Sequence, residues 1–419
     1  MTANPQPILT SQADMMRAIQ LPNKLPGLTG AIHAVGYLPV GSLPFQQEIF
    51  TNGFSMNVRK CVLTSVDLST GNVKQRILDY RAGHMAEPLP DGRLLALCRL
   101  DNKMFVLNSA HEMLQQIDAP EGYDYGGHAL VLPEKDLVIL PCAKAPFAQT
   151  ADDIGLFVVR RMSTLELVKT VPASGINPHQ IMLTPDGKGF AVAYYGNVGK
   201  HGEGIIGFNV LAPRLVIYDL ETFAPIRIFD IPTKYEGASN HLFFDHQGHI
   251  YAQLLQVAHA VPGGLKAWCD YYRKFNLPAT DLKSQETRRR QFFYHTPLIR
   301  FNVQTGELEE VFQDPENFRY PLSSCQHPET GRVFIACPGS GNFVVREPDD
   351  TYKAIPAFSL GLFAGAGVCN IPNTPYVALC DEEHGITIFD AHKLKAVARY
   401  NVTFSTQTHS TYSSWGLPA

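Results

Sequence analysis

The sequence predicts an all-β protein, a seven-bladed β-propeller of four-stranded blades, on three observations. Seven hairpin-like segments follow one another, each with short runs of β-branched or aromatic residues around a polar turn. Apolar runs end at Cys98 and Cys142, 44 residues apart, and at Cys337 and Cys380, 43 residues apart, which is the length of one propeller blade. Turn sequences such as "LPDG" and "TPDG" separate paired apolar runs ahead of the hairpins.

Each repeat is expected to contain an apolar strand, a tight turn, a second apolar strand, a variable loop and a hairpin. The hairpins are expected at 63–78, 105–117, 156–171, 214–231, 298–312, 342–355 and 385–400. Where repeats are longer, the extra residues fall after the second strand, at 144–153, 196–213 and 255–297. The last of these has apolar residues at helical spacing, which predicts a partly helical insertion in the fifth blade.

The two ends of the chain are expected to meet in the first blade. We assign 1–47 to an N-terminal extension and 48–419 to the propeller, with "EIFTNGFS" (48–55) as the second strand of that blade. The tail 403–419, which contains His409, is expected to supply its innermost strand, because borrowing one terminus removes a free sheet edge. The segment 31–41, which contains His33, competes for that place, and a blade formed by 28–47 would make the ring eight-bladed.

Composition excludes several classes of protein. The net charge of −4 gives no field that would favour nucleic acid or an acidic membrane, and no apolar run approaches 18 residues. The N-terminal stretch lacks the charged-then-apolar layout of a secretory signal. None of the eight cysteines forms a CxxC pair, so we interpret them as buried, reduced residues. A cytoplasmic protein that acts on a small molecule is therefore expected, with a protein partner as a further option.

Histidines recur at the start of the expected innermost strands. The segments "AGHMAEPL", "GGHALVL", "NPHQIML" and "SNHLFFD" place four of them at nearly one register, and the tail adds a fifth; the set is His84, His128, His179, His241 and His409. With 15 histidines in 419 residues, chance would place roughly a quarter of a histidine at seven equivalent positions. Histidine therefore recurs at this register far more often than chance predicts.

Innermost strands surround the central channel of a propeller, so these imidazoles are expected to meet at one end of it. A cage of imidazoles suits a first-row transition metal, with Fe(II) favoured and copper the second choice. Tyr125 stands beside His128, and Cys369 falls near the corresponding position of a later blade, so we predict both as catalytic residues. If the protein is an enzyme, we expect a metal-dependent oxidoreductase or oxygenase that uses dioxygen on a small molecule.

Two other interpretations stay open. A histidine ahead of an innermost strand can bond a hydroxyl or carboxylate of the next blade and serve structure alone. The turns also differ in length by one residue, and a one-residue slip reverses a strand side chain. In that case the protein would be a non-catalytic scaffold that binds a protein or peptide through the channel mouth and the loop insertions.

The chain resembles the bacterial family catalogued as domain of unknown function fifteen-thirteen, from about residue 60 to the tail. The likeness lies in "GGHALVLPEKDLVIL", "SGINPHQIMLTPDGKGFAVAYYGN", "NHLFFDHQGHIYAQL" and "GAGVCNIPN", with Thr408 and His409 matching the closing motif. The resemblance implies a propeller connected with iron uptake, and it supports the five histidines and Cys369 as a shared set. This chain differs in lacking a twin-arginine leader, in having Gln180 where the family has an acidic residue, and in its larger insertions.

Overall fold

The computed structural model describes most of the chain, with gaps at both ends and in several loops. The described residues are 6–7, 20–37, 48–51, 54–57, 61–78, 83–98, 102–145, 148–198, 211–235, 237–255, 296–362, 365–381, 385–402 and 409–418. The expected helical part of the insertion 255–297 lies outside them, as does most of the insertion 196–213.

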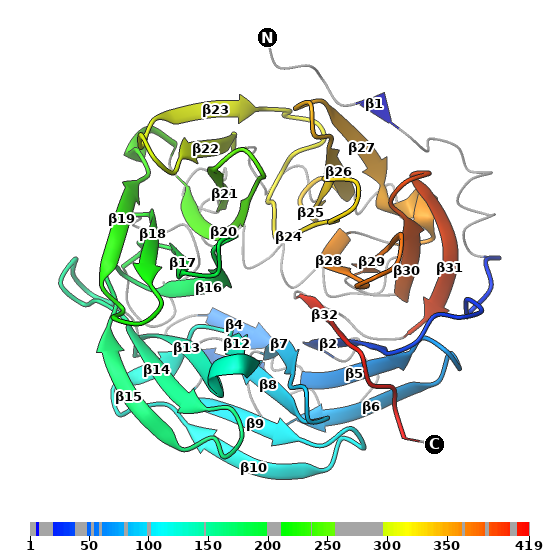
Figure 1. Cartoon of the computed structure of the whole chain (residues 1–419), viewed down its shortest axis with the longest axis horizontal. Coiled ribbons are helices and arrows are strands. Elements are labelled where there is room, and N and C mark those ends of the chain that lie inside the picture. The colour runs from blue at the N-terminus through cyan, green and yellow to red at the C-terminus, as the bar shows by residue number, and fades with distance from the viewer. Residues whose placement is uncertain are drawn as a thin grey trace.

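Seven antiparallel blades surround a central axis, as predicted, and each has four strands from the axis to the rim (Figure 1). Blades 1 to 4 consist, from the axis outward, of β32 (Ser410–Ser413), β2 (Ala31–Tyr37), β5 (Cys61–Asp67) and β6 (Val73–Leu78); β7 (Gly83–Pro88), β8 (Leu94–Cys98), β9 (Lys103–Leu107) and β10 (Met113–Asp118); β11 (Tyr123–Tyr125) with β12 (Leu130–Leu132), β13 (Leu137–Lys144), β14 (Leu156–Arg161) and β15 (Leu167–Pro172); and β16 (Pro178–Leu183), β17 (Gly189–Tyr194), β18 (Arg214–Asp219) and β19 (Pro225–Asp230). Blades 5 to 7 consist of β20 (Ala238–Phe244), β21 (His249–Leu255), β22 (Leu298–Asn302) and β23 (Leu308–Phe312); β24 (Ser323–Gln326), β25 (Val333–Cys337), β26 (Asn342–Arg346) and β27 (Tyr352–Pro356); and β28 (Gly365–Asn370), β29 (Tyr376–Asp381), β30 (Gly385–Asp390) and β31 (Lys395–Asn401). The seven hairpins expected from the sequence are the two outer strands of each blade.

The first blade is built from both ends of the chain. β32 pairs with β2 from Ala31–Ser413 to Ala34–Ser410, so the C-terminal segment is the innermost strand. The second strand is β2, which pairs with β5 along its whole length. The expected start of the propeller at residue 48 is therefore wrong, and the segment 31–37 belongs to blade 1 and not to an eighth blade.

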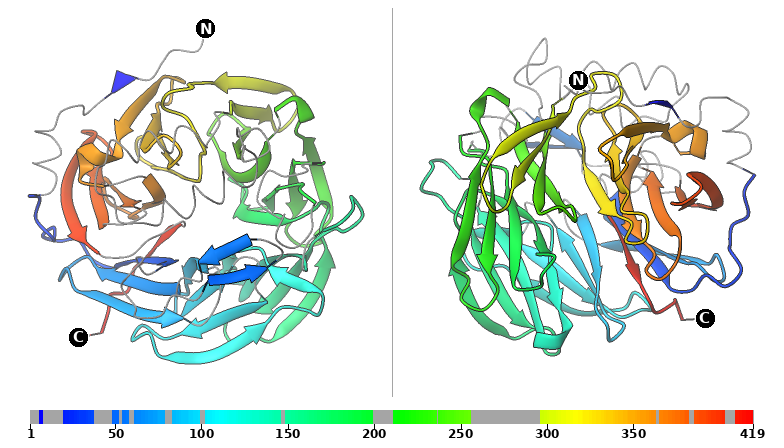
Figure 2. Two further views of the ribbon diagram at one scale, coloured as in Figure 1. Left: turned by 180° about the vertical axis from the view of Figure 1, so that it is seen from behind. Right: turned by 45° about the horizontal axis from the view of Figure 1, so that its top comes forward.

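The segment expected as that second strand forms a hairpin of its own. β3 (Glu48–Thr51) pairs with β4 (Phe54–Asn57) in a separate two-stranded sheet. Figure 2 shows this hairpin over the face of the ring that is turned away in Figure 1. It lies in the connection between β2 and β5, so it is an insertion between the second and third strands, as in other blades.

The remaining elements are small. β1 (Gln6–Pro7) pairs in parallel with β27 and adds a fifth strand at the rim of blade 6. The helices in the described parts of the chain are three short 3-10 turns, η1 (Pro133–Lys135), η2 (Thr233–Tyr235) and η3 (Ala357–Leu360). None of the described helices has the length and apolar character needed to cross a membrane.

Adjacent blades pack face to face through apolar clusters. One cluster joins blades 1, 2 and 3 and contains Cys98 and Cys142, both fully buried. Each fully buried leucine or valine in such a cluster contributes about 1.5–3 kcal/mol relative to exposure. The described cysteines are free thiols, as the sequence predicts, and these two serve as small apolar residues.

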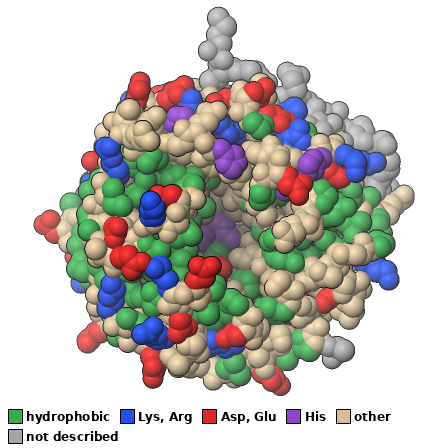
Figure 3. All heavy atoms as spheres, in the orientation of Figure 1, with side chains coloured by type: hydrophobic (Ala, Val, Ile, Leu, Met, Phe, Trp, Pro, Cys, Tyr) green, Lys and Arg blue, Asp and Glu red, His purple; other side chains and the backbone are tan. Residues whose placement is uncertain are grey.

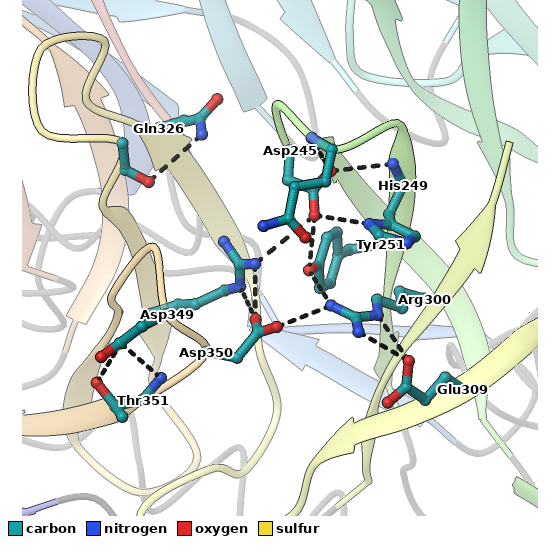
Figure 4. A network of polar contacts seen from close by, with 12 residues as sticks. Asp245, His249, Tyr251, Arg300, Glu309, Gln326, Asp349, Asp350 and Thr351 are labelled. Carbon is teal, nitrogen blue, oxygen red and sulfur yellow. Dashed lines mark hydrogen bonds and ion pairs between the residues drawn. The ribbon is translucent and has the colours of Figure 1, made fainter.

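A buried ion-pair network links blades 5 and 6 (Figure 4). The Arg346 guanidinium, 2% exposed, lies 2.6 Å from Asp350 Oδ1 and 3.6 Å from Asp245 Oδ2. Asp350 also pairs with Arg300 of blade 5 at 2.9 Å. The Tyr251 hydroxyl donates to Asp245 Oδ2 at 3.0 Å. The turns that carry Asp245 and Asp350 are thereby fixed against each other, which keeps the two blades in register around the axis.

Candidate metal centre

Five histidines from five consecutive blades meet at the axis. Each offers one ring nitrogen, these nitrogens lie within 4.8 Å of one another, and all five residues are buried: His84, His128, His179, His241 and His409. They come from β7, the β11–β12 break, β16, β20 and the residue ahead of β32. Figure 3 shows histidine side chains at the floor of a hollow in the middle of one face. The structure thus brings together every histidine that the sequence singled out as a metal ligand.

Irregular pairing in the innermost strands places these side chains. The β7–β8 register shifts between Gly83 and Met85, which leaves His84 at a bulge. The β16–β17 register shifts between Pro178 and Ile181, on either side of His179, and the β20–β21 register shifts just ahead of His241. A bulge inserts an extra residue and redirects the local side chain. The one-residue differences in turn length are therefore absorbed at the site itself, and the side chains still reach the axis.

The innermost strand of blade 3 is broken, and the break presents His128. β11 and β12 both pair with β13, and Gly126 and Gly127 lie between them. Gly127 has a φ of +97°, and a Cβ on it would lie 2.5 Å from Cδ2 of His84. A side chain here would be strained and would displace His84. Glycine is required at this position because the backbone passes directly against the neighbouring imidazole.

The nitrogen positions fit a single metal ion. Nε2 of His128 lies 3.2 Å from Nε2 of His84 and 3.4 Å from Nε2 of His241, which in turn lies 3.1 Å from Nε2 of His409. Nitrogens bound to one ion at about 2.0–2.1 Å would be about 3 Å apart when adjacent and about 4.2 Å apart when opposite. These three separations fall in that range, and the spread of all five nitrogens, 4.8 Å, is slightly wider, so a modest inward shift would let these residues hold a transition metal.

His179 is oriented by the broken strand of blade 3. Its Nδ1 lies 2.6 Å from the Gly126 carbonyl oxygen, the arrangement in which Nδ1–H donates and Nε2 keeps its lone pair. The Tyr195 ring packs against the imidazole with centroids 4.7 Å apart. Metal-binding histidines commonly donate their second nitrogen to a backbone carbonyl in this way. The Gly126 carbonyl therefore acts as the support for one corner of the centre.

Other buried histidines of this chain behave differently and give a useful contrast. His33 lies 2.6 Å from the Ser65 hydroxyl and 2.8 Å from the Ser413 hydroxyl, and the Ser65 hydroxyl also lies 2.7 Å from His111 Nε2. This chain of contacts links β32, β2, β5 and the β9–β10 turn. It is the structural arrangement that the sequence left open for the axial histidines. The axial five instead direct ring nitrogens toward one another.

Tyr125, predicted as a catalytic residue, does not reach the centre. It lies in the apolar cluster between blades 2 and 3, and its hydroxyl lies 3.5 Å from the carbonyl oxygen of Ile117, on the outermost strand of blade 2. Burial raises the pKa of this phenol well above its ordinary value. The break at Gly126 and Gly127 turns the chain between Tyr125 and His128, so neighbours in sequence face different directions. This corrects the prediction.

The Cys369 sulfur is also outside the group of converging donor atoms. Its side chain belongs to the apolar cluster between blades 7 and 1, and burial raises the pKa of the thiol to about 12, with a partly opposing effect of the Ser410 hydroxyl. A neutral thiol at this position is a packing group and not a thiolate ligand. Ser324 and Cys325 hold the corresponding place in blade 6, so blades 6 and 7 contribute none of the five imidazoles.

Sequence reasoning missed the polar residues beside His241. Asn240 precedes it on β20, and Gln253 lies opposite it on β21; both are fully buried. The sequence holds only a weak signal for Asn240, a polar residue directly ahead of a strand histidine where the other blades have Gly83, Gly127 and Pro178. It holds none for Gln253, whose proximity depends on the strand pairing.

Comparison with known proteins identifies the fold only. No known family profile matches this chain, and no curated protein is matched by its sequence. Among solved structures, cobalt-substituted apocarotenoid oxygenase of Synechocystis is similar with a TM-score of 0.56 and 13% identity over 96% of this chain and 99% of that one. Hydrazine synthase of Kuenenia stuttgartiensis is similar with a TM-score of 0.55 and 12% identity over 84% of this chain and 98% of that one. At these identities the likeness establishes a shared propeller fold.

Proposed function

We propose that this protein is a metalloenzyme that binds one transition metal through the five axial histidines and oxidises a small molecule. The observation that carries the proposal is the convergence of five buried ring nitrogens within 4.8 Å. Fe(II) is the proposed metal and copper the second candidate, because imidazole suits both. The similarity in fold to a cobalt-substituted oxygenase supports the same class of chemistry.

The residues present give the metal a defined environment. The five ligands would be imidazoles, which bind a metal in their neutral form, and the described group of converging donors includes neither carboxylate nor thiolate. The charge of a bound ion would therefore stay uncompensated by its ligands, which favours an electron-rich partner at any further coordination position. When bound, the ion would supply Lewis acidity and one-electron redox chemistry. The chain's own groups hold the imidazoles in register and keep bulk water from them by burial.

Metal content tests the proposal. Protein purified without an affinity tag should contain about one iron or copper per chain, measured by inductively coupled plasma mass spectrometry, and should consume dioxygen in the presence of an oxidisable small molecule. The variant with His128→Ala and His179→Ala should lose the metal and the oxygen uptake. Substoichiometric metal that these substitutions leave unchanged would refute the metalloenzyme and favour a propeller scaffold that binds a protein partner through its loops.

We also propose a cytoplasmic location. Cys98, the last residue of β8, and Cys142, near the end of β13, are both fully buried free thiols. A reducing compartment keeps such thiols unmodified. Cell fractionation with an antibody to the chain tests this, and recovery in a secreted or periplasmic fraction would contradict it.

A further inference from the structure

Two buried amide oxygens lie beside the metal centre without partners. They are Oδ1 of Asn240 and Oε1 of Gln253, which have no hydrogen-bond partner among the described residues. Both side chains are 0% exposed. Leaving a buried acceptor unpaired carries a free-energy cost, because the oxygen has lost its contact with water and gained no donor in return. Two such costs next to one site point to a ligand that supplies the missing donors.

The other end of each amide is fixed, which determines where the oxygens lie. Gln253 Nε2 donates to the Ser324 hydroxyl at 2.5 Å, and Asn240 Nδ2 donates to the Pro321 carbonyl oxygen at 3.1 Å. Ser324 is on β24, the innermost strand of blade 6, and Pro321 shortly precedes that strand. Since the nitrogens point to blade 6, both oxygens lie in the seam between β20 and β24. We call this the blade 5–6 seam.

The seam adjoins the side of the centre that has no imidazole. Blades 1 to 5 supply the five histidines, whereas the innermost strands of blades 6 and 7, "SSCQ" and "GAGVCN", contain no histidine. His241 pairs directly with Gln253 across β20 and β21, and cross-strand partners have Cβ atoms about 4.5–5.5 Å apart. A molecule held at these oxygens would therefore lie within reach of the ion.

An apolar cluster continues the seam on the side of the loop insertions. It is formed by Tyr195, Ala238 and Leu255, with Tyr320 packed against it. Ala238 and Leu255 are each two residues from one of the amides, at the ends of the same two strands. Tyr195 also contacts His179, so the cluster reaches the centre itself. The blade 5–6 seam thus has hydrogen-bond acceptors and an apolar surface next to each other.

We infer that the blade 5–6 seam is the substrate subsite and that it takes a neutral, largely apolar alcohol. This inference rests on the proposed metal function. The alcohol donates its hydroxyl hydrogen to Gln253 Oε1 or Asn240 Oδ1, and its apolar body contacts the cluster that contains Tyr195 and Leu255. A hydroxyl fits better than an amine, because an ammonium ion would be desolvated beside neutral amides with no carboxylate to pair with it.

Binding of benzyl alcohol and of benzyl methyl ether to the full chain tests the inference, since only the alcohol has a donor. The cobalt-loaded protein should show a saturable change in its visible absorption with the alcohol, and the ether should bind at least about tenfold more weakly, the loss of roughly one hydrogen bond. Gln253→Met keeps the side-chain length and removes the acceptor, so it should reduce that preference to about threefold or less. The matched control is Gln326→Met on β24 of blade 6, where the Gln326 side-chain nitrogen donates to the Gly331 carbonyl oxygen at 3.4 Å; this variant should keep the preference.

The outcomes separate this inference from the metal proposal. Cobalt content is measured first on every variant and should not change with Gln253→Met. Protein that takes up no metal refutes the proposed function, and saturation-transfer NMR on that apoprotein still compares the alcohol with the ether. Equal binding of the two, no binding of either because the seam holds only ordered water, or a preference that survives Gln253→Met would each overturn the inference.

Discussion

Replacing Gly127 by alanine should weaken metal binding more than it weakens the fold. The new Cβ would lie 2.5 Å from Cδ2 and 2.9 Å from Cγ of the His84 ring. Ordinary carbon contacts are about 3.5–4.0 Å, so the ring must move by about 1 Å. The Nε2–Nε2 separation of 3.2 Å between His84 and His128 would then be lost. Disturbing a group that orients a ligand costs about 10–100-fold in metal affinity.

A matched control separates this effect from backbone strain. Gly92 lies in the turn between β7 and β8 of the blade that carries His84; its φ is +89°, and a Cβ there would meet nothing within 4 Å. Both alanine variants bear the strain of a positive φ, about 1–2 kcal/mol. Metal affinity is measured by competition with a chromogenic chelator, and stability by urea unfolding of the apoprotein. Equal metal affinities for Gly127→Ala and Gly92→Ala would refute the account of how His84 is positioned.

Three further predictions concern ring closure, pH and the blade interface. His409→Ala should remove the ligand carried by the closing strand and lower metal affinity at least about tenfold, with unchanged circular dichroism; unchanged affinity would contradict its role as a ligand. Burial lowers the pKa of His33 to about 3 and of His111 to about 4, so between those values and 6.5 the unfolded chain binds more protons than the folded chain. The free energy of unfolding should therefore fall by about 1.4 kcal/mol per histidine for each pH unit below 6.5. Equal free energies of unfolding at pH 7 and pH 5, measured with urea, would contradict this. Arg346→Met should cost about 3–5 kcal/mol because it leaves Asp245 buried without its cation, and a thermal midpoint within a degree or two of the parent protein would show that the network contributes little.

The sequence predicts the repeats well because each blade repeats one physical pattern. The end of β8 at Cys98, and that of β13 to within two residues of Cys142, could be located from the alternation of apolar runs and turns alone. The start of the first blade could not, because "AIHAVGY" and "EIFTNGFS" are both credible strands. Only the pairing of β2 with β5 and β32 decides between them, and the β2–β32 part of it joins residues more than 370 positions apart, Ala31 and Ser413 among them.

At the metal centre, too, the sequence predicts the repeated features and not those that depend on local irregularities or strand pairing. The recurrence of histidine at one register predicts where the imidazoles converge, since the ring symmetry sets their height. The bulges that aim them are not visible in the periodicity, and neither is the turn of the chain that takes Tyr125 away from His128. Residues that act through strand pairing, such as Gln253 opposite His241, have no signature in a single sequence.

X-ray absorption spectroscopy of the iron-loaded protein tests the central claim most directly. If the axial imidazoles bind one ion, the first shell should contain four or five nitrogens at about 2.0–2.2 Å with the outer-shell scattering of imidazole rings, and His128→Ala should reduce that scattering by one ring. A first shell of oxygen without imidazole scattering, unchanged by His128→Ala, would show that the metal lies elsewhere and that the histidines at the axis serve the fold alone.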